Sequence, residues 1–166
     1  MEAHSIIDHI PRLRRYARAL VGDRHSADDL VQDTLERACN KFHLWRAGSD
    51  LRAWLFTVMH NVFVNQVRSA RYQLEQAVEE VPVVLVRETQ GDALELAEVE
   101  RALRRLPAEQ REVLLLVAVE QMSYAEVSRA LSVPIGTVMS RLSRARERMR
   151  AAMAGGNPAV SLKVVK

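Results

Sequence analysis

The residues best suited to act on another molecule lie in the last predicted helix, residues 135–153. This segment contains five arginines and only one carboxylate, Glu147, so positive charge is concentrated on this helix. One face is predicted to be buried: Ile135, Val138, Leu142, Ala145 and Met149. The exposed face and its flank carry small, hydroxyl-bearing and charged side chains: Gly136, Thr137, Ser140, Arg141, Ser143, Arg144, Glu147 and Arg148. Arginine can bind guanine edges and hydroxyls can bind phosphates, so this helix suits a DNA major groove.

The segment before this helix supports the same interpretation. A short predicted helix, residues 124–131, and a turn at residues 132–134 precede it. A short helix, a tight turn and a second helix form the arrangement of a helix-turn-helix, whose second helix enters the major groove. A solvated helix in a bundle would show the same spacing, and that alternative stays open.

A second candidate surface lies on a long predicted helix from Leu51 to about Arg71. Its predicted core face is apolar: Leu51, Leu55, Val58, Met59, Val62 and Phe63. One flank beside that face carries a different set: Trp54, Thr57, Asn61, Asn65 and Arg68. Asparagine can bind base edges and an aromatic ring can stack on an unpaired base, so the flank suits single-stranded DNA. A tryptophan that anchors the core and solvated asparagines are the alternative.

A third surface is acidic. Five residues share one arc of the helix that we predict from Ser26 onward: Asp28, Asp29, Gln32, Asp33 and Glu36. Such an arc repels DNA, so in a DNA-binding chain it indicates a basic protein partner. A solvated helix face remains the alternative, since Asp28 and Asp29 lie in the first turn, where the helix dipole favours carboxylates.

No arrangement of residues indicates an enzyme, a cofactor or a metal ion. His43, His60, Cys39 and Ser69 show no catalytic spacing, and the chain has no glycine-rich phosphate loop. The single cysteine cannot form an internal disulfide, and no stretch approaches the ~20 apolar residues that span a bilayer. We therefore expect a cytoplasmic protein without cofactors.

The pattern of the whole chain predicts an all-α protein. Of its 166 residues, 48% are hydrophobic, glycine and proline are sparse, and the net charge is only +3. We expect a first helical domain over residues 1–72, a flexible linker over 73–92, a four-helix domain over 93–154 and a loose tail over 155–166. The apolar run Val83 to Val86 in the linker either packs as an extended segment or docks onto a partner.

Several residues predict where helices begin and end. Pro11 kinks the first helical segment or marks where its regular part begins, and Gly22 ends it. Ser26 with Asp29, and Ser123 with Glu126, are spaced as capping boxes. Ser49 or Asp50 is expected to cap the long helix. Pro107 fits the first position of a helix that runs to Glu120.

Taken together, these segments resemble the extracytoplasmic-function (ECF) sigma factors, group IV of the sigma-70 family. The matching stretches follow in family order: SADDLVQDTLERA (26–38), LRAWLFTVMHN (51–61), LPAEQREV (106–113), SYAEV (123–127) and PIGTVMSRLSRAR (134–146). Several separate motifs in register are far more specific than any one of them.

The resemblance implies a sigma factor that directs RNA polymerase to promoters, and it assigns roles to the three surfaces. The acidic arc would dock on the coiled coil of the polymerase's largest subunit, and the flap is a further expected polymerase contact. The minus-ten element would be opened and read by Trp54, Asn61, Asn65 and Arg68. The minus-thirty-five element would be read by Thr137, Ser140, Arg141, Ser143 and Arg144. At Met139 many relatives carry a basic residue, so the base or phosphate contact that the resemblance implies at that position does not carry over to this chain.

The resemblance also implies regulation. Such proteins are held inactive by an anti-sigma factor and serve stress or envelope responses, and Val83 to Val86 would join the anti-sigma interface. Two alternatives remain: a helix-turn-helix regulator that acts without polymerase, and a sigma mimic that titrates an anti-sigma factor. The first predicts tight duplex binding by the free chain, usually as a dimer. The second usually carries an attached receiver domain.

Overall fold

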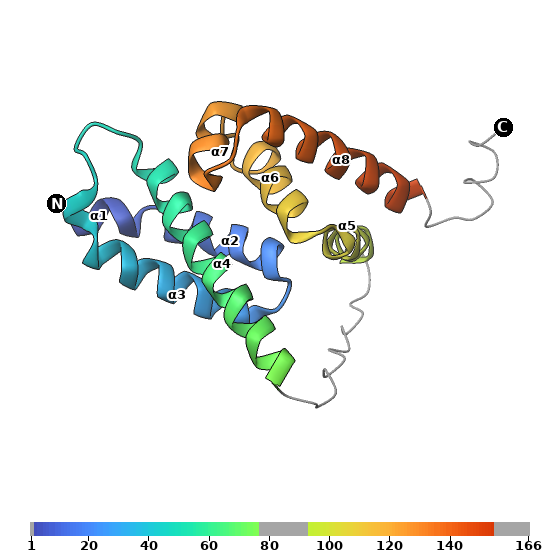
Figure 1. Cartoon of the computed structure of the whole chain (residues 1–166), viewed down its shortest axis with the longest axis horizontal. Coiled ribbons are helices and arrows are strands. Elements are labelled where there is room, and N and C mark those ends of the chain that lie inside the picture. Colours follow the sequence, from blue (N-terminus) through green and yellow to red (C-terminus); the bar gives the residue numbers. More distant parts are fainter. Residues whose placement is uncertain (1, 77–92, 155–166) are drawn as a thin grey trace.

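The computed structural model describes residues 2–76 and 93–154, and every secondary-structure element in these ranges is a helix (Figure 1). The elements follow in order: α1 (Glu2–Ile7), α2 (Ile10–Val21), α3 (Arg24–Asn40), the 3-10 turn η1 (Phe42–Leu44), α4 (Leu51–Gln76), α5 (Ala93–Arg105), α6 (Ala108–Ala118), α7 (Tyr124–Leu131) and α8 (Ile135–Ala154). The all-α prediction is confirmed. The run Val83 to Val86 and the tail lie outside the described residues.

Most helix ends lie at or near the residues that the sequence predicted. Pro11 stands in the first turn of α2, so it marks a helix start and does not kink a longer helix. Gly22 ends α2 with φ 77°, a left-handed conformation that glycine adopts without strain. The capping box of α7 is present, with Ser123 Oγ accepting from Glu126 N–H and Glu126 Oε1 accepting from Ser123 N–H.

The predicted start of the acidic helix was wrong by one turn. α3 begins at Arg24, and its cap is Asp23, whose carboxylate accepts both the N–H and the hydroxyl of Ser26. Asp23 directly follows the left-handed Gly22 and directly precedes α3. Its carboxylate is therefore placed to accept hydrogen bonds from the free amides of the first turn of α3. Ser26 therefore donates to the cap from inside the first turn.

Three other boundaries differ from the prediction. α4 continues to Gln76, so the four residues expected to open the linker are helical. They contain no glycine or proline that would end the helix. Pro107 caps α6 and precedes its first residue, and α6 ends at Ala118, two residues before Glu120. Ile135 is 43% exposed because it stands at the very start of α8, so the buried face of that helix begins at Val138.

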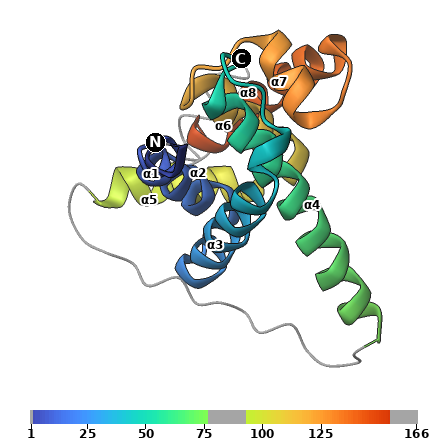
Figure 2. The same cartoon turned by 90° about the vertical axis from the view of Figure 1, so that its left-hand side faces the viewer.

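The first half of the chain, α1 to α4, packs against the second half, α5 to α8. Contacts join α4 to α7 and α2 to both α5 and α6, and buried side chains from both halves form one continuous core (Figures 1 and 2). Gly22 shows how close the approach is, since a Cβ atom there would lie 2.6 Å from Arg104 Nε. The two predicted helical units are thus held in one closed arrangement.

Candidate nucleic-acid interface

The helix-turn-helix is built by α7, the turn at residues 132–134, and α8. Ser132 ends α7 in the left-handed region, with φ 55°, and the Ser128 hydroxyl donates to the Val133 carbonyl across the turn. Val138, Leu142 and Ala145 of α8 are buried against α6 and α7. This packing fixes the angle at which the opposite face of α8 is presented to solvent.

That opposite face carries most of the predicted duplex-reading residues. Ser140, Ser143 and Arg144 are exposed, whereas Thr137 and Arg141 are half-buried. Arg141 is held by an ion pair, with its Nη2 3.6 Å from Glu109 Oε2 on α6. The exposed members can reach a ligand directly. To bind DNA, Arg141 would have to break its ion pair with Glu109 or contact both Glu109 and the DNA.

The predicted single-strand surface on α4 divides into two parts. Asn61, Asn65 and Arg68 are exposed, as a surface for bases requires. Trp54 is half-buried and packs edge-on against Phe42 of η1, with ring centroids 6.2 Å apart, while Phe42 also contacts Trp45 at 5.3 Å. Trp54 is therefore anchored in an aromatic cluster but keeps part of its surface exposed.

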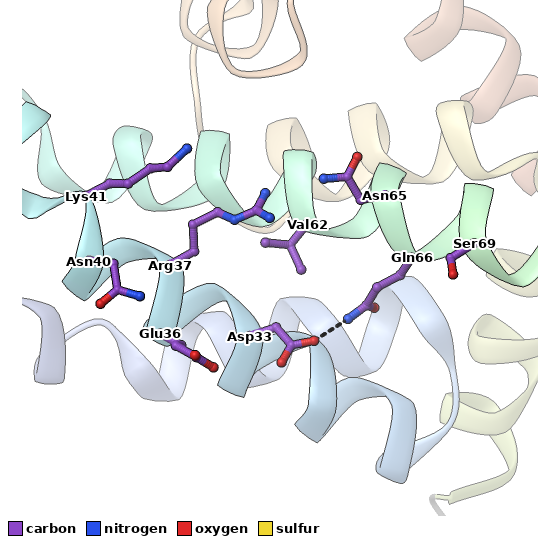
Figure 3. Close-up of a pocket in the computed structure, with 9 residues that line it drawn as sticks. All are labelled: Asp33, Glu36, Arg37, Asn40, Lys41, Val62, Asn65, Gln66 and Ser69. Carbon is purple, nitrogen blue, oxygen red and sulfur yellow. Dashed lines mark hydrogen bonds between the residues drawn. The ribbon is translucent and has the colours of Figure 1, made fainter.

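The acidic arc on α3 is exposed. Asp28, Asp29, Gln32, Asp33 and Glu36 all face solvent. Asp29 lies 3.6 Å from His25 Nε2. Asp33 accepts a hydrogen bond of 2.8 Å from Gln66 on α4, which ties the acidic arc to the neighbouring helix (Figure 3).

Between α3 and α4 lies a groove of about 500 Å³ that the sequence analysis missed (Figure 3). Asp33 and Glu36 line one part of it, and Asn65 and Ser69 line another. Arg37 and Lys41 add two cations that had not been considered. Arg37 lies in the last turn of α3, and Lys41 caps its C-terminus four residues later, a spacing that the sequence already contained.

Several polar side chains make contacts between the first and the second half of the chain. Arg52 on α4 donates to the Glu120 carbonyl at 2.9 Å and lies 3.7 Å from Glu126 on α7. His60 Nδ1 lies 2.7 Å from Glu112 Oε1, and both side chains are largely buried. Arg111 donates to the Leu20 carbonyl at 2.6 Å. The approach of Arg52 to Glu126 joins α4 to α7, which lies beside the α4 flank that carries Trp54 and Thr57, across a pocket of about 640 Å³.

Glu120 is the most deeply buried charge in this interface. Its side chain is inaccessible to solvent, and its oxygens lie 3.3 Å from Arg12 and 3.6 Å from Arg15 without accepting a hydrogen bond from any described residue. Burial raises the pKa of Glu120 above its ordinary value, although Arg15 and Arg12 oppose that rise. The carboxylate is thus held in place at an electrostatic cost.

Comparison with known proteins identifies both halves and the chain as a whole. Residues 6–60 match the Sigma2 domain of PhyR, and residues 96–149 match Sigma-70, region 4. The ECF RNA polymerase sigma factor EcfG of Rhodopseudomonas palustris is 38% identical over 88% of this chain and 81% of its own length. The chain belongs to the ECF RNA polymerase sigma factors. The ECF sigma factor SigM of Mycobacterium tuberculosis strain H37Rv is 32% identical over 93% of the chain and 78% of its own length.

Solved structures share the arrangement of both halves. The sigma factor RpoE of Bartonella quintana, in co-crystal with the anti-sigma factor NepR, is 34% identical with a TM-score of 0.80. That match covers 90% of this chain and 94% of the solved one. CnrH in complex with the cytosolic domain of CnrY is 26% identical with a TM-score of 0.69, covering 94% and 89%.

Two further properties of the sigma factor concern membranes and metals. Among the described residues, no helix is both long and apolar enough to cross a membrane. Within the same ranges, no cluster of histidine, cysteine and carboxylate side chains could hold a metal ion.

Proposed function

We propose that this sigma factor divides promoter recognition between its halves, with α8 reading the minus-thirty-five duplex and α4 reading the minus-ten element as single strand. The observation that carries the proposal is the geometry of α8. Its buried face is fixed by α6 and α7, so Ser140, Ser143 and Arg144 project outward from a rigid helix-turn-helix. Thr137 and Arg141, half-buried beside them, would complete the duplex contact.

For the minus-ten element, Asn61, Asn65 and Arg68 are exposed on successive turns of α4. Trp54 lies further along the same flank, where the exposed part of its side chain can stack beside an unpaired base. Capturing flipped bases would offset a few kcal/mol of the free energy needed to melt the duplex.

The acidic arc supports docking on RNA polymerase. Its five residues are all exposed, and a basic coiled coil in the polymerase's largest subunit would complement their charge. The flap would contact the second half. A helix-turn-helix making a few phosphate contacts binds DNA weakly and in a salt-dependent way, so polymerase must supply affinity by tethering both halves. The sigma factor itself has no catalytic activity.

Regulation by an anti-sigma factor is supported by the complex of the Bartonella quintana relative with NepR. We expect this sigma factor to be held inactive by such a partner in the cytoplasm and released for stress or envelope responses. The match of residues 6–60 to the Sigma2 domain of PhyR also favours a second candidate, a sigma mimic that titrates an anti-sigma factor.

In vitro transcription with core polymerase tests the proposal. On fragments of the host genome, we expect specific initiation that requires this protein. Arg144→Ala should weaken the upstream footprint about tenfold, because an arginine contact with a base contributes about 1–3 kcal/mol. Asn61→Ala should leave that footprint and reduce open complex. Arg105→Ala, at the exposed end of α5, is the matched control and should change neither.

Three outcomes contradict the proposal. An unchanged upstream footprint with Arg144→Ala removes α8 from promoter reading. Tight, specific duplex binding by the free chain without polymerase supports the stand-alone regulator. Binding to an anti-sigma factor without any initiation supports the sigma mimic.

A further inference from the structure

Two apolar side chains stand exposed at the start of α8, the helix that we propose to enter the major groove. Met139 is 49% exposed, and Ile135, one turn earlier, is 43% exposed. The backbone around Met139 is fixed, because Val138 and Leu142 are buried in the core. Single apolar residues at a protein surface are common, so the surroundings of Met139 decide what it can bind.

Those surroundings are polar and positively charged. Met139 lines a pocket of about 360 Å³ together with Tyr124 of α7 and with polar or charged residues of α8: Ser143, Arg146, Glu147 and Arg150. Two arginines against one glutamate give this pocket a net positive charge, which suits the phosphates that border a groove of DNA. A ligand that covers Met139 must therefore be negatively charged at its borders and apolar where it meets the thioether.

DNA offers this combination at thymine. In the major groove, thymine alone among the four bases presents a methyl group, at C5. A methionine donates no hydrogen bond, so it cannot make the contacts with guanine or phosphate that a basic residue makes. Its flexible and polarizable side chain adapts well to a small apolar partner. The place of Met139 early in α8 agrees with this role, because the first turns of a recognition helix contact base edges.

We propose that Met139 is a specificity-determining residue that selects a thymine in the minus-thirty-five duplex by covering its C5 methyl group. Ser140 and Arg144, exposed beside it on α8, hold the duplex by polar contacts. The inference rests on the proposed function, because it assumes that α8 lies in the major groove. An arginine at the same position would favour guanine, so Met139 gives this sigma factor a different base preference.

Replacing thymine by uracil tests the contact, because uracil pairs with adenine in the same way and lacks only the C5 methyl group. Core polymerase with the full chain first selects its upstream element from a promoter library randomised in that element. Each thymine of the selected element is then replaced by uracil, one at a time, and the affinity of the holoenzyme for the upstream element is measured by footprinting. At one thymine we expect the wild-type affinity to fall about fourfold, the factor that corresponds to burial of one methyl group.

Met139→Ala removes the side chain that covers the methyl group and leaves the fold intact, since Met139 is exposed. This variant should bind the thymine duplex at least about fourfold more weakly than the wild type and should no longer distinguish thymine from uracil. Met153→Ala is the matched control, because Met153 is a methionine of similar exposure, 43%, at the other end of α8. It should keep both the affinity of the wild type and its response to uracil.

A loss with uracil that disappears in Met139→Ala and persists in Met153→Ala supports the inference. The inference is overturned if the selected element contains no thymine, or if uracil is neutral at every thymine. It is also overturned if Met139→Ala and the wild type respond to uracil alike, because Met139 would then act elsewhere. In each of these cases, an upstream footprint leaves the proposed function standing. A wild-type chain that gives no upstream footprint contradicts the proposed function and the inference with it.

Discussion

At the scale of single residues, the most informative side chain is Glu120, which no motif of the sequence singled out. It follows α6 and is buried beside Arg12 and Arg15 of α2. Both arginines keep part of their side chains in solvent, so they neutralise the carboxylate incompletely. The net result is a pKa raised above the ordinary value of a glutamate.

The raised pKa of Glu120 makes the stability of the folded protein depend on pH. With its pKa raised in the folded state, Glu120 binds more protons when folded than when unfolded, so its contribution to stability falls as pH rises through its folded pKa. Glu120→Gln should therefore raise the melting temperature by a few degrees at neutral pH and flatten this part of the pH dependence. Thermal melts from pH 4 to pH 8 measure it. A lower melting temperature at neutral pH would show that the ion pairs with Arg12 and Arg15 outweigh burial.

At the scale of an element, α7 depends on its cap more than the longer helices do. It has only eight residues, and its two reciprocal hydrogen bonds at Ser123 satisfy amides that would otherwise be free. α7 also packs against α4, α6 and α8. A loosened α7 would therefore disturb both the helix-turn-helix and the contact between the two halves.

We predict that Ser123→Ala lowers stability by about 1 kcal/mol, the typical contribution of a serine cap. The melting temperature should fall by about 2–4 °C for a chain of this size. Ser69→Ala, at an exposed position inside α4, is the matched control and should not lower the melting temperature, because alanine forms helix at least as well as serine. Calorimetry on both variants decides the matter, and equal melting temperatures would mean that tertiary packing alone holds α7.

At the scale of the whole molecule, the closed arrangement combines a continuous apolar core with a small number of polar contacts between the halves. Arg52 is the clearest, because its guanidinium bonds the Glu120 carbonyl and approaches Glu126, both in the second half. A hydrogen bond from a charged donor contributes about 1.5–3 kcal/mol. Losing it should shift the chain toward an open form without unfolding either half.

Fluorescence energy transfer measures this shift, with dyes on Cys39 of α3 and on Ala151→Cys at the end of α8, both exposed positions. Adding Arg52→Ala should lower the closed-to-open ratio about tenfold and reduce the transfer. Arg46→Ala, exposed in the loop before α4, should leave transfer unchanged. Unchanged transfer in Arg52→Ala would mean that the apolar contacts alone hold the halves together.

The sequence by itself determined the helices, most of their ends, and the three surfaces that we propose to bind DNA and polymerase. These depend on local chemistry: apolar residues at helical spacing, Gly22 in a left-handed turn, and Ser123 with Glu126 at the right interval. Local reasoning failed where neighbours compete, as when Asp23 and not Ser26 capped α3.

Only the tertiary structure decided how the two halves meet. The pairs of Arg52 with Glu126, His60 with Glu112 and Arg12 with Glu120 join residues more than 50 positions apart, and no spacing rule connects such positions. The same holds for the half-burial of Trp54 and for the groove between α3 and α4. A helix pattern shows which face is apolar, whereas the partner of that face depends on packing between distant segments.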